Sequence, residues 1–210
     1  GEIRLDFLNG VEGINVDLSS RIIYNDGFGN FETYLGDFDQ LRGTHYDDMI
    51  VGSSTKNYEY FILRGGNDTL DGGGLFDTVS YDREDNIQNL DVDLSQGLAT
   101  GIWDGLAFKH QLRNIEEIFG SSNNDMISGS ENSDFLDGRA GNDTISGGTG
   151  NDVLTGGGGA DLFVFQGSLS GDLGDNVITD FNPNEGDELI ILDENGNEYE
   201  SSNLDLQVTL

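Results

Sequence analysis

The chain has no cysteine and only one proline among its 210 residues. Without cysteine there is no disulfide to stabilise the fold and no thiolate for the usual zinc sites. The two histidines, His45 and His110, lie far apart in the sequence, which also argues against zinc. No apolar run is long enough to cross a bilayer, so we expect no membrane insertion by this segment.

Basic residues are scarce. Nine lysines and arginines face 40 acidic residues, for a formal net charge of −31. No basic residue follows Arg139, whereas fourteen acidic residues lie between Asp143 and Asp205. The strongly negative net charge excludes nucleic acid and anionic membranes as direct partners. It also disfavours polyanionic glycans unless calcium bridges the charges.

Glycine and aspartate are abundant, and residues 120–164 arrange them in five consecutive nonapeptides: GSSNNDMIS, GSENSDFLD, GRAGNDTIS, GGTGNDVLT and GGGGADLFV. Each begins with glycine, has aspartate in its sixth place and has an apolar residue in its eighth. A nine-residue period indicates one turn and one short strand per unit, with the eighth side chain pointing inward. Two units then complete one coil of an all-β, right-handed parallel β-roll. The phased pattern disfavours a disordered Gly/Asp-rich linker.

Aspartates eighteen residues apart would stack along the edges of such a roll: Asp125, Asp143 and Asp161 on one edge, Asp134 and Asp152 on the other. Carboxylates about 4.8 Å apart repel one another unless a cation lies between them. The glycines allow the turns to direct carbonyl oxygens inward. All-oxygen coordination of this kind suits Ca²⁺ better than Mg²⁺ or Zn²⁺.

These residues resemble the RTX (repeats-in-toxin) calcium-binding repeats of bacterial proteins exported by type I secretion. The resemblance implies ions between alternate turns. One turn gives its first and third carbonyls and its aspartate, and the other gives its second and fourth carbonyls and its aspartate. The implied ligand sets are Gly120, Ser122, Asp125 with Arg139, Gly141, Asp143; Gly129, Glu131, Asp134 with Gly148, Gly150, Asp152; and Gly138, Ala140, Asp143 with Gly157, Gly159, Asp161. A fourth ion would use Gly147, Thr149 and Asp152, with Asp172 or Asp175 from the next coil.

A longer internal repeat of about 76 residues underlies the nonapeptides. INVDLSS at Ile14 matches LDVDLSQ at Leu90, and GGNDTLDGG at Gly65 matches AGNDTISGG at Ala140. The first copy therefore contains a looser array, with turns ending at Asp48, Asn57, Asp68 and Asp77. We expect one ion held by Gly43, His45, Asp48, Arg64, Gly66 and Asp68, and a weak or absent ion between Asn57 and Asp77. The total expectation is about four to six calcium ions.

These patterns divide the chain into strand-rich leading coils at 1–42, the first RTX array at 43–80, strand-rich connecting coils at 81–119, the second array at 120–164, and a C-terminal β cap with an export-signal region at 165–210. The connecting segment is expected to form wider coils of the same solenoid. Trp103, Phe108 and the aromatics at Phe28–Phe31 are expected to fill the interior. DENGNEYE at Asp193 is expected to form a hairpin turn at Asn195-Gly196 rather than an EF-hand loop.

The resemblance implies a non-catalytic calcium-binding module that folds on Ca²⁺ after type I export, outside or on the surface of a Gram-negative bacterium. Its partners would be upstream domains of the same polypeptide and the secretion machinery. The alternative is a calcium-dependent glycan- or surface-recognition module of an adhesin or a polysaccharide-modifying enzyme. No catalytic residue is predicted, because each array aspartate already has a structural role and neither histidine lies near a nucleophile motif.

Overall fold

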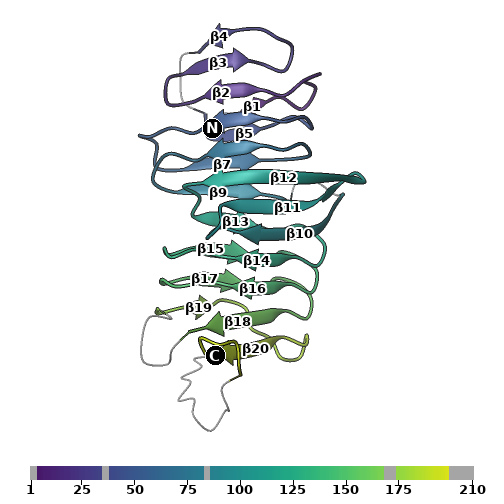
Figure 1. Cartoon of the computed structure of the whole chain (residues 1–210), viewed down its shortest axis with the longest axis vertical. Helices are drawn as coiled ribbons and strands as arrows, with labels where there is room; N and C mark the ends of the chain where they lie inside the picture. The colour runs from purple at the N-terminus through teal and green to yellow at the C-terminus, as the bar shows by residue number, and fades with distance from the viewer. Residues whose placement is uncertain (1–3, 35–37, 83–85, 168–173, 199–210) are drawn as a thin grey trace.

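The computed structural model describes residues 4–34, 38–82, 86–167 and 174–198, which form twenty β-strands. The strands stack into an elongated body, with β4 at one end and β20 at the other (Figure 1). No helix occurs among the described residues, and thus none that could span a membrane. The predicted all-β class with parallel sheets is confirmed.

The strands form two sheets. Sheet A contains, in spatial order, β1 (Arg4–Asp6), β5 (Gln40–Arg42), β7 (Glu59–Ile62), β9 (Asp77–Ser80), β13 (Glu117–Phe119), β15 (Phe135–Asp137), β17 (Val153–Thr155) and β19 (Val177–Ile178). Sheet B contains β20 (Glu188–Leu192), β18 (Leu162–Gln166), β16 (Thr144–Ser146), β14 (Met126–Ser128), β10 (Ile87–Asp93), β11 (Leu98–Trp103), β12 (Leu106–Arg113), β8 (Thr69–Asp71), β6 (Met49–Val51), β2 (Asn15–Asp17), β3 (Ile22–Asn25) and β4 (Glu32–Thr33).

From β13 to β20 the chain passes alternately between the two sheets, so that two nonapeptides complete one coil. Ile127 pairs with Ile145 and Ile145 with Phe163 in sheet B, while Leu136 pairs with Leu154 in sheet A. These eighth-place side chains are at most 1% exposed. Their burial between the sheets is the hydrophobic contribution that closes each coil.

The internal duplication is visible in the strand pairing. Asn15 of β2 pairs with Met49 of β6, and Asp91 of β10 pairs with Met126 of β14 in the equivalent way. In each copy the strand continues into an antiparallel meander, β2–β3–β4 in the first and β10–β11–β12 in the second. We call the second one the join meander, because β12 pairs in parallel with β8 of the first copy.

The join meander adds strands to only one of the two sheets. Sheet B gains three consecutive strands, whereas β9 pairs directly with β13 in sheet A. Residues 86–113 therefore belong to the same body as the repeats, as expected, although their strands are antiparallel to one another.

The aromatic residues follow the expectation only in part. Phe108 is 3% exposed, and Trp103 packs against the core. Phe28 and Phe31 are 56% and 63% exposed, so the prediction that they fill the interior is wrong. They flank β4, the outermost strand of sheet B, both of whose residues are themselves exposed.

The segment at Asp193 forms the predicted turn. The Asp193 amide donates to the Asn197 carbonyl at 2.8 Å, and Leu192 forms an antiparallel bridge with Glu198. The side chain of Asp193 accepts the amides of Asn195 and Asn197, each at 2.8 Å. Its carboxylate is thus used within a tight turn.

Candidate metal centre

Two ladders of side chains run along the edges of the solenoid, at the points where the turns enter the strands. The strand registers of sheet B place Asp48, Asp68, Asp125, Asp143, Asp161 and Asp187 on the first ladder. Those of sheet A place Asp39, Glu59, Asp77, Glu116, Asp134, Asp152 and Asn176 on the second.

Successive residues of each ladder are linked by their own backbone. On the first ladder a backbone amide donates to the next carboxylate: Asp48 to Asp68 at 3.0 Å, Asp125 to Asp143 at 2.8 Å, Asp143 to Asp161 at 2.9 Å and Asp161 to Asp187 at 3.1 Å. On the second, Asp77 donates to Glu116 at 2.8 Å, Asp134 to Asp152 at 3.0 Å and Asp152 to the Asn176 side chain at 2.8 Å. Each bond fixes the orientation of one acceptor oxygen.

The turns stack closely because glycine occupies their fourth place. Gly141 and Gly159 have φ of 128° and 143°, which side chains rarely tolerate. A Cβ on Gly159 would lie 1.7 Å from the carbonyl oxygen of Gly141, and one on Gly150 would lie 2.2 Å from that of Asn132. Fourth-place glycine is therefore required wherever one turn lies directly above another.

The opening glycine encloses the aspartate of its own turn. A Cβ on Gly138 would lie 2.3 Å from Asp143 Oδ2, and one on Gly147 would lie 2.1 Å from Asp152 Oδ2. Several enclosed carboxylate oxygens have no hydrogen-bond partner among the described residues: Asp68 Oδ2, Asp77 Oδ1, Asp134 Oδ1, Asp143 Oδ2, Asp152 Oδ2 and Asp161 Oδ2. Burying such acceptors unpaired is costly. Enclosed carboxylates beside turn carbonyls are the donor set that a hard cation prefers.

Burial and mutual repulsion disfavour the charged forms of these carboxylates. Burial, together with the charges of Asp125 and Asp161, raises the pKa of Asp143 to about 7. Burial likewise raises the pKa of Asp77 to about 7 and the pKa values of Asp125 and Asp152 to about 6. A divalent cation between the carboxylates would remove both effects.

Apart from Asn57, Asp172 and Asp175, the predicted ligand residues lie in the turns of one of the two ladders. The first-ladder turns contain Gly43, His45, Asp48, Arg64, Gly66, Asp68, Gly120, Ser122, Asp125, Gly138, Arg139, Ala140, Gly141, Asp143, Gly157, Gly159 and Asp161. The second-ladder turns contain Asp77, Gly129, Glu131, Asp134, Gly147, Gly148, Thr149, Gly150 and Asp152. Their role as calcium ligands remains a prediction.

Arg139 shows why a bulky residue is compatible with the second place of a turn. Its backbone takes a φ of 76°, and its side chain leaves the turn. The guanidinium lies 3.2 Å from a carboxylate oxygen of Asp82, 3.3 Å from one of Asp137 and 4.0 Å from the Phe119 ring centre. The carbonyl of Arg139 stays in the turn, where it accepts the amide of Gly158 at 2.9 Å.

The second ladder differs from the expectation in the first copy. Asn57 is exposed, whereas Glu59 is 2% exposed and accepts the amide of Ser53. The two extra residues of this turn move the ladder position from Asn57 to Glu59, so the prediction for Asn57 is wrong. An acidic residue directly before the apolar run YFIL was the available sequence signal.

Sequence reasoning also missed Glu116, Asp187 and Asn176. Asn176, not Asp175, follows Asp152 on the second ladder; the Asp175 amide instead donates to the Asn151 side chain. The prediction for Asp172 lies outside the described residues. Asp187 continues the first ladder beyond the nonapeptides, because its carboxylate accepts the amides of Asp161 and Asn182 as a sixth-place aspartate does.

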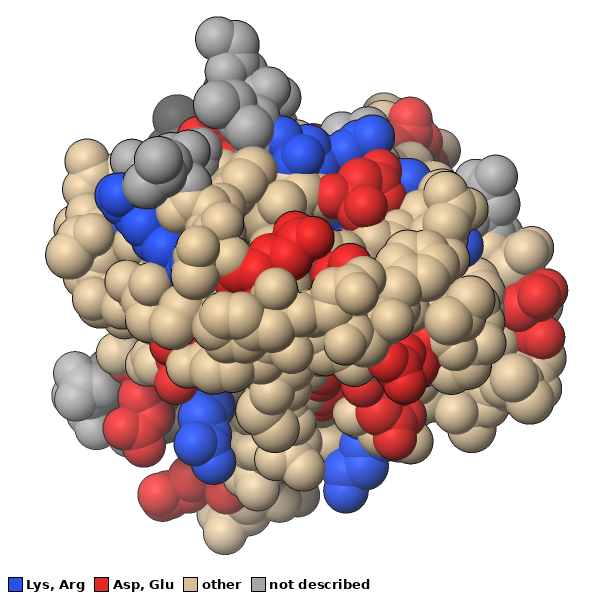
Figure 2. All heavy atoms as spheres, turned by 90° about the horizontal axis from the view of Figure 1, so that it is seen from above, with Lys and Arg blue, Asp and Glu red and all other residues tan. Residues whose placement is uncertain are grey.

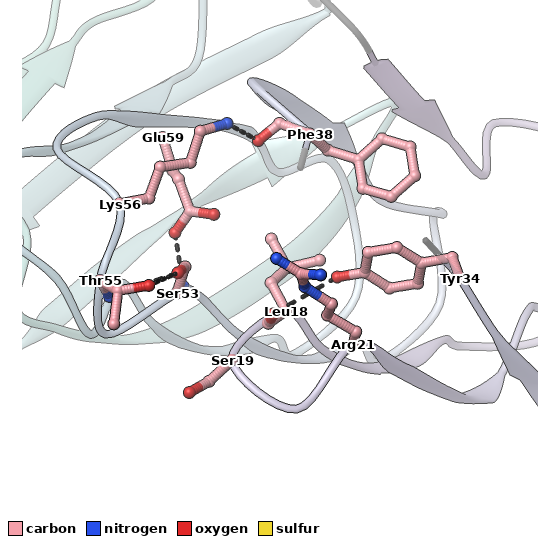
Figure 3. A pocket seen from close by; sticks show the side chains of 9 residues that line it. All are labelled: Leu18, Ser19, Arg21, Tyr34, Phe38, Ser53, Thr55, Lys56 and Glu59. Carbon is pink, nitrogen blue, oxygen red and sulfur yellow. Dashed lines mark hydrogen bonds between the residues drawn. The ribbon is translucent and has the colours of Figure 1, made fainter. Parts of the chain in front are cut away.

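A lysine lies at the start of the second ladder. Lys56 Nζ donates to Asp39 Oδ1 at 2.8 Å and to the Phe38 carbonyl oxygen. Figure 3 shows this lysine at the rim of a small pocket, opposite Tyr34 and Arg21. A protein cation therefore contacts the ladder at this point in the first copy.

Two largely parallel sheets are joined by glycine-rich turns that enclose stacked carboxylates. This arrangement defines a repeat solenoid of the calcium-binding type. The comparison with known families agrees. The RTX calcium-binding nonapeptide repeat matches residues 62–79, 115–145 and 137–165, in four copies. The chain is thus identified as carrying calcium-binding repeats of the RTX family. No curated protein matches it.

The turn geometry predicts a sharp difference between two neighbouring glycines. Gly159→Ala should lower the free energy of unfolding in saturating calcium by about 2 kcal/mol or more, because the Cβ meets the Gly141 carbonyl at a positive φ. Gly158→Ala is the matched control, since a Cβ there meets nothing within 4 Å. It should change stability by less than about 0.5 kcal/mol. Equal effects in urea unfolding would contradict this account of the turns.

The raised pKa values predict a pH dependence. A carboxyl group whose pKa is higher in the fold than in the unfolded chain stabilises the fold below its unfolded pKa of about 4. That contribution is lost as pH rises through about 6 to 7, the folded pKa values of Asp152 and Asp143. The metal-free protein should therefore gain strand content on acidification, while the calcium needed for half-saturation should rise. Calcium midpoints that agree at about pH 8 and about pH 5.5 would refute this.

Proposed function

We propose that this segment is a non-catalytic calcium-binding module that folds when it meets extracellular calcium and stabilises or displays attached domains. The observation that supports this is the row of enclosed, unpaired carboxylate oxygens on both ladders. Calcium binding itself follows from the RTX repeats. The folding switch, the export route and the attached domains are our proposal.

The expected free energies of calcium binding favour a calcium-dependent folding switch. Extracellular-type calcium sites have Kd values of about 10⁻⁴ to 10⁻³ M. At a Kd of about 10⁻⁴ M, about 10 mM calcium stabilises the folded chain by about 2.7 kcal/mol per site, whereas submicromolar calcium contributes almost nothing. Four or five sites would contribute on the order of 10 kcal/mol, comparable with the stability of a whole domain.

The proposed cellular role follows from this difference. RTX repeats are typical of type I secreted bacterial proteins, and a chain that stays unfolded at cytosolic calcium suits export through a narrow channel. Calcium outside the cell would then drive folding from the repeats. The partners in this proposal are calcium ions, the secretion machinery and upstream domains of the same polypeptide.

A calcium titration followed by circular dichroism and small-angle scattering tests the switch. We expect a cooperative change from an expanded coil to an elongated, strand-rich particle at submillimolar to millimolar calcium, and no such change with magnesium. A chain already folded in metal-free buffer, or one that magnesium folds equally well, would refute the proposal.

A matched pair of variants tests whether the ladder is responsible. Asp143→Asn removes a carboxylate that is 1% exposed and that two predicted ions share. Asp91→Asn removes the same charge from an exposed strand position. The first should raise the calcium midpoint about tenfold or more and the second should leave it nearly unchanged, because screened surface charges contribute little.

Recognition of a glycan or another surface is the second candidate, favoured by exposed aromatics on the first meander. Tyr24 and Phe31 meet edge to face with ring centres 6.0 Å apart, and both are exposed, as is Phe28. The end of the molecule viewed in Figure 2 carries basic as well as acidic side chains. This mixed charge contrasts with the sequence after Arg139, which is without bases.

The second candidate predicts calcium-dependent binding on a glycan array that Phe31→Ala weakens about tenfold or more, since exposed aromatics commonly provide stacking area. Phe135→Ala is the control, because Phe135 is also partly exposed but lies in the regular array. Binding that is absent, or that both variants weaken equally, would argue against this role for the first meander.

A further inference from the structure

His110 occupies a ladder position. In the pairing of β12 with β8, Gln111 lies opposite Thr69, so His110 lies beside Asp68. This is the relation that Asp143 bears to Asp125 in the regular array, where Thr144 lies opposite Met126. The first ladder therefore passes from a carboxylate to an imidazole where the two copies join.

The imidazole engages the groups that were expected to bind calcium at this turn. His110 Nε2 lies 3.2 Å from Asp68 Oδ2, and both side chains are fully buried. A backbone hydrogen bond also links the ring to Arg64, whose carbonyl is one of the predicted ligands. On the other side, Tyr81 Oη lies 3.1 Å from His110 Nδ1. The ring thus has a polar group near each nitrogen, although the contact of Nε2 with Asp68 is not aligned as a hydrogen bond.

Trp103 covers the same turn from outside. The Arg64 guanidinium lies 4.8 Å from the Trp103 ring centre, and the His45 ring stacks on it at 6.0 Å. A Cβ on Gly65 would lie 2.5 Å from the indole. In the regular array this space above a turn is filled by the next nonapeptide turn, as Gly157 lies over the Arg139 carbonyl. Here the join meander provides a tryptophan instead.

We propose that His110, backed by Tyr81 and covered by Trp103, takes the place of a calcium ion at the Asp68 turn and holds the join between the two copies without metal. The His110 imidazole fills the space beside the Asp68 carboxylate in which a cation would otherwise lie. His110 lies on the side of Asp68 away from Asp48, so the ion expected between the Asp48 and Asp68 turns stays a prediction.

The contrast with Asp143 supports the assignment. Both aspartates are 1% exposed and both accept the amide of the preceding ladder residue. Asp68 Oδ2 and Asp143 Oδ2 both lack a hydrogen-bond partner among the described residues, but different groups lie beside them. The His110 ring lies 3.2 Å from Asp68 Oδ2, whereas the next coil offers Asp143 another turn of carbonyls. The coil that follows Asp68 is a hairpin strand with no such turn, so it could not complete an oxygen cage.

Hydrogen exchange of the whole segment in metal-free buffer tests this. Amides of β8, β9 and β12 should exchange on the order of tenfold or more slowly compared with those of β14 and β16. In saturating calcium the two groups should become similarly protected. His110→Leu should abolish the metal-free protection of β8, β9 and β12, because it buries the Asp68 carboxylate against an apolar side chain in place of a polar ring. His110→Gln, which retains a side-chain donor, should keep part of it.

Lys109→Gln is the control, since that side chain is exposed on β12 itself and its loss should not affect the metal-free protection of β8, β9 and β12. The inference rests on the proposed calcium switch only for the behaviour of β14 and β16. If all strands are equally protected without metal, the switch fails. If β8, β9 and β12 exchange as fast as β14 and β16, or if His110→Leu matches the wild type, the role of His110 fails while the switch stands.

Discussion

Burial of stacked carboxylates is the constraint on which the rest of this structure depends. A coil of two nonapeptides brings aspartates to strand spacing on both edges, and the backbone amide of one fixes the carboxylate of the next. The same folding encloses oxygens such as Asp143 Oδ2 and Asp161 Oδ2 without donors. In the proposed switch, the apolar core closes when this repulsion is removed, by protons at low pH or by cations at neutral pH.

Tight stacking of the turns converts this local requirement into a regular body. Glycines at positive φ lie directly over carbonyl groups of the turn below, as Gly150 lies over Asn132 and Gly159 over Gly141. Carbonyls and carboxylates are then repeated at the coil period, so one site geometry serves several coils. The first copy is less regular, and there Lys56 lies beside Asp39 on the second ladder and His110 beside Asp68 on the first.

The sequence was sufficient to predict the regular array, because its period alone fixes which residues point inward and which stack. Ile127, Ile145 and Phe163 were predictable as core for this reason. The sequence was not sufficient to predict that Glu59 and Asn176 occupy ladder positions. Insertions change the spacing there, and only the pairing of the strands decides which side chain joins the ladder. The exposure of Phe31 was equally hidden, since it depends on β4 being the outer strand of sheet B.

The two ladders behave differently at the join, and this difference follows from the asymmetry of the sheets. Sheet B contains the join meander, so three strands separate Asp68 from Asp125 on the first ladder. Sheet A passes directly from β9 to β13, so the second ladder continues from Asp77 through Glu116 to Asp134. Cations on the second ladder would therefore couple the two copies, whereas the first ladder is divided into separate arrays. A duplicated roll can thus combine a metal-independent contact at His110 with a continuous row of carboxylates on the opposite edge.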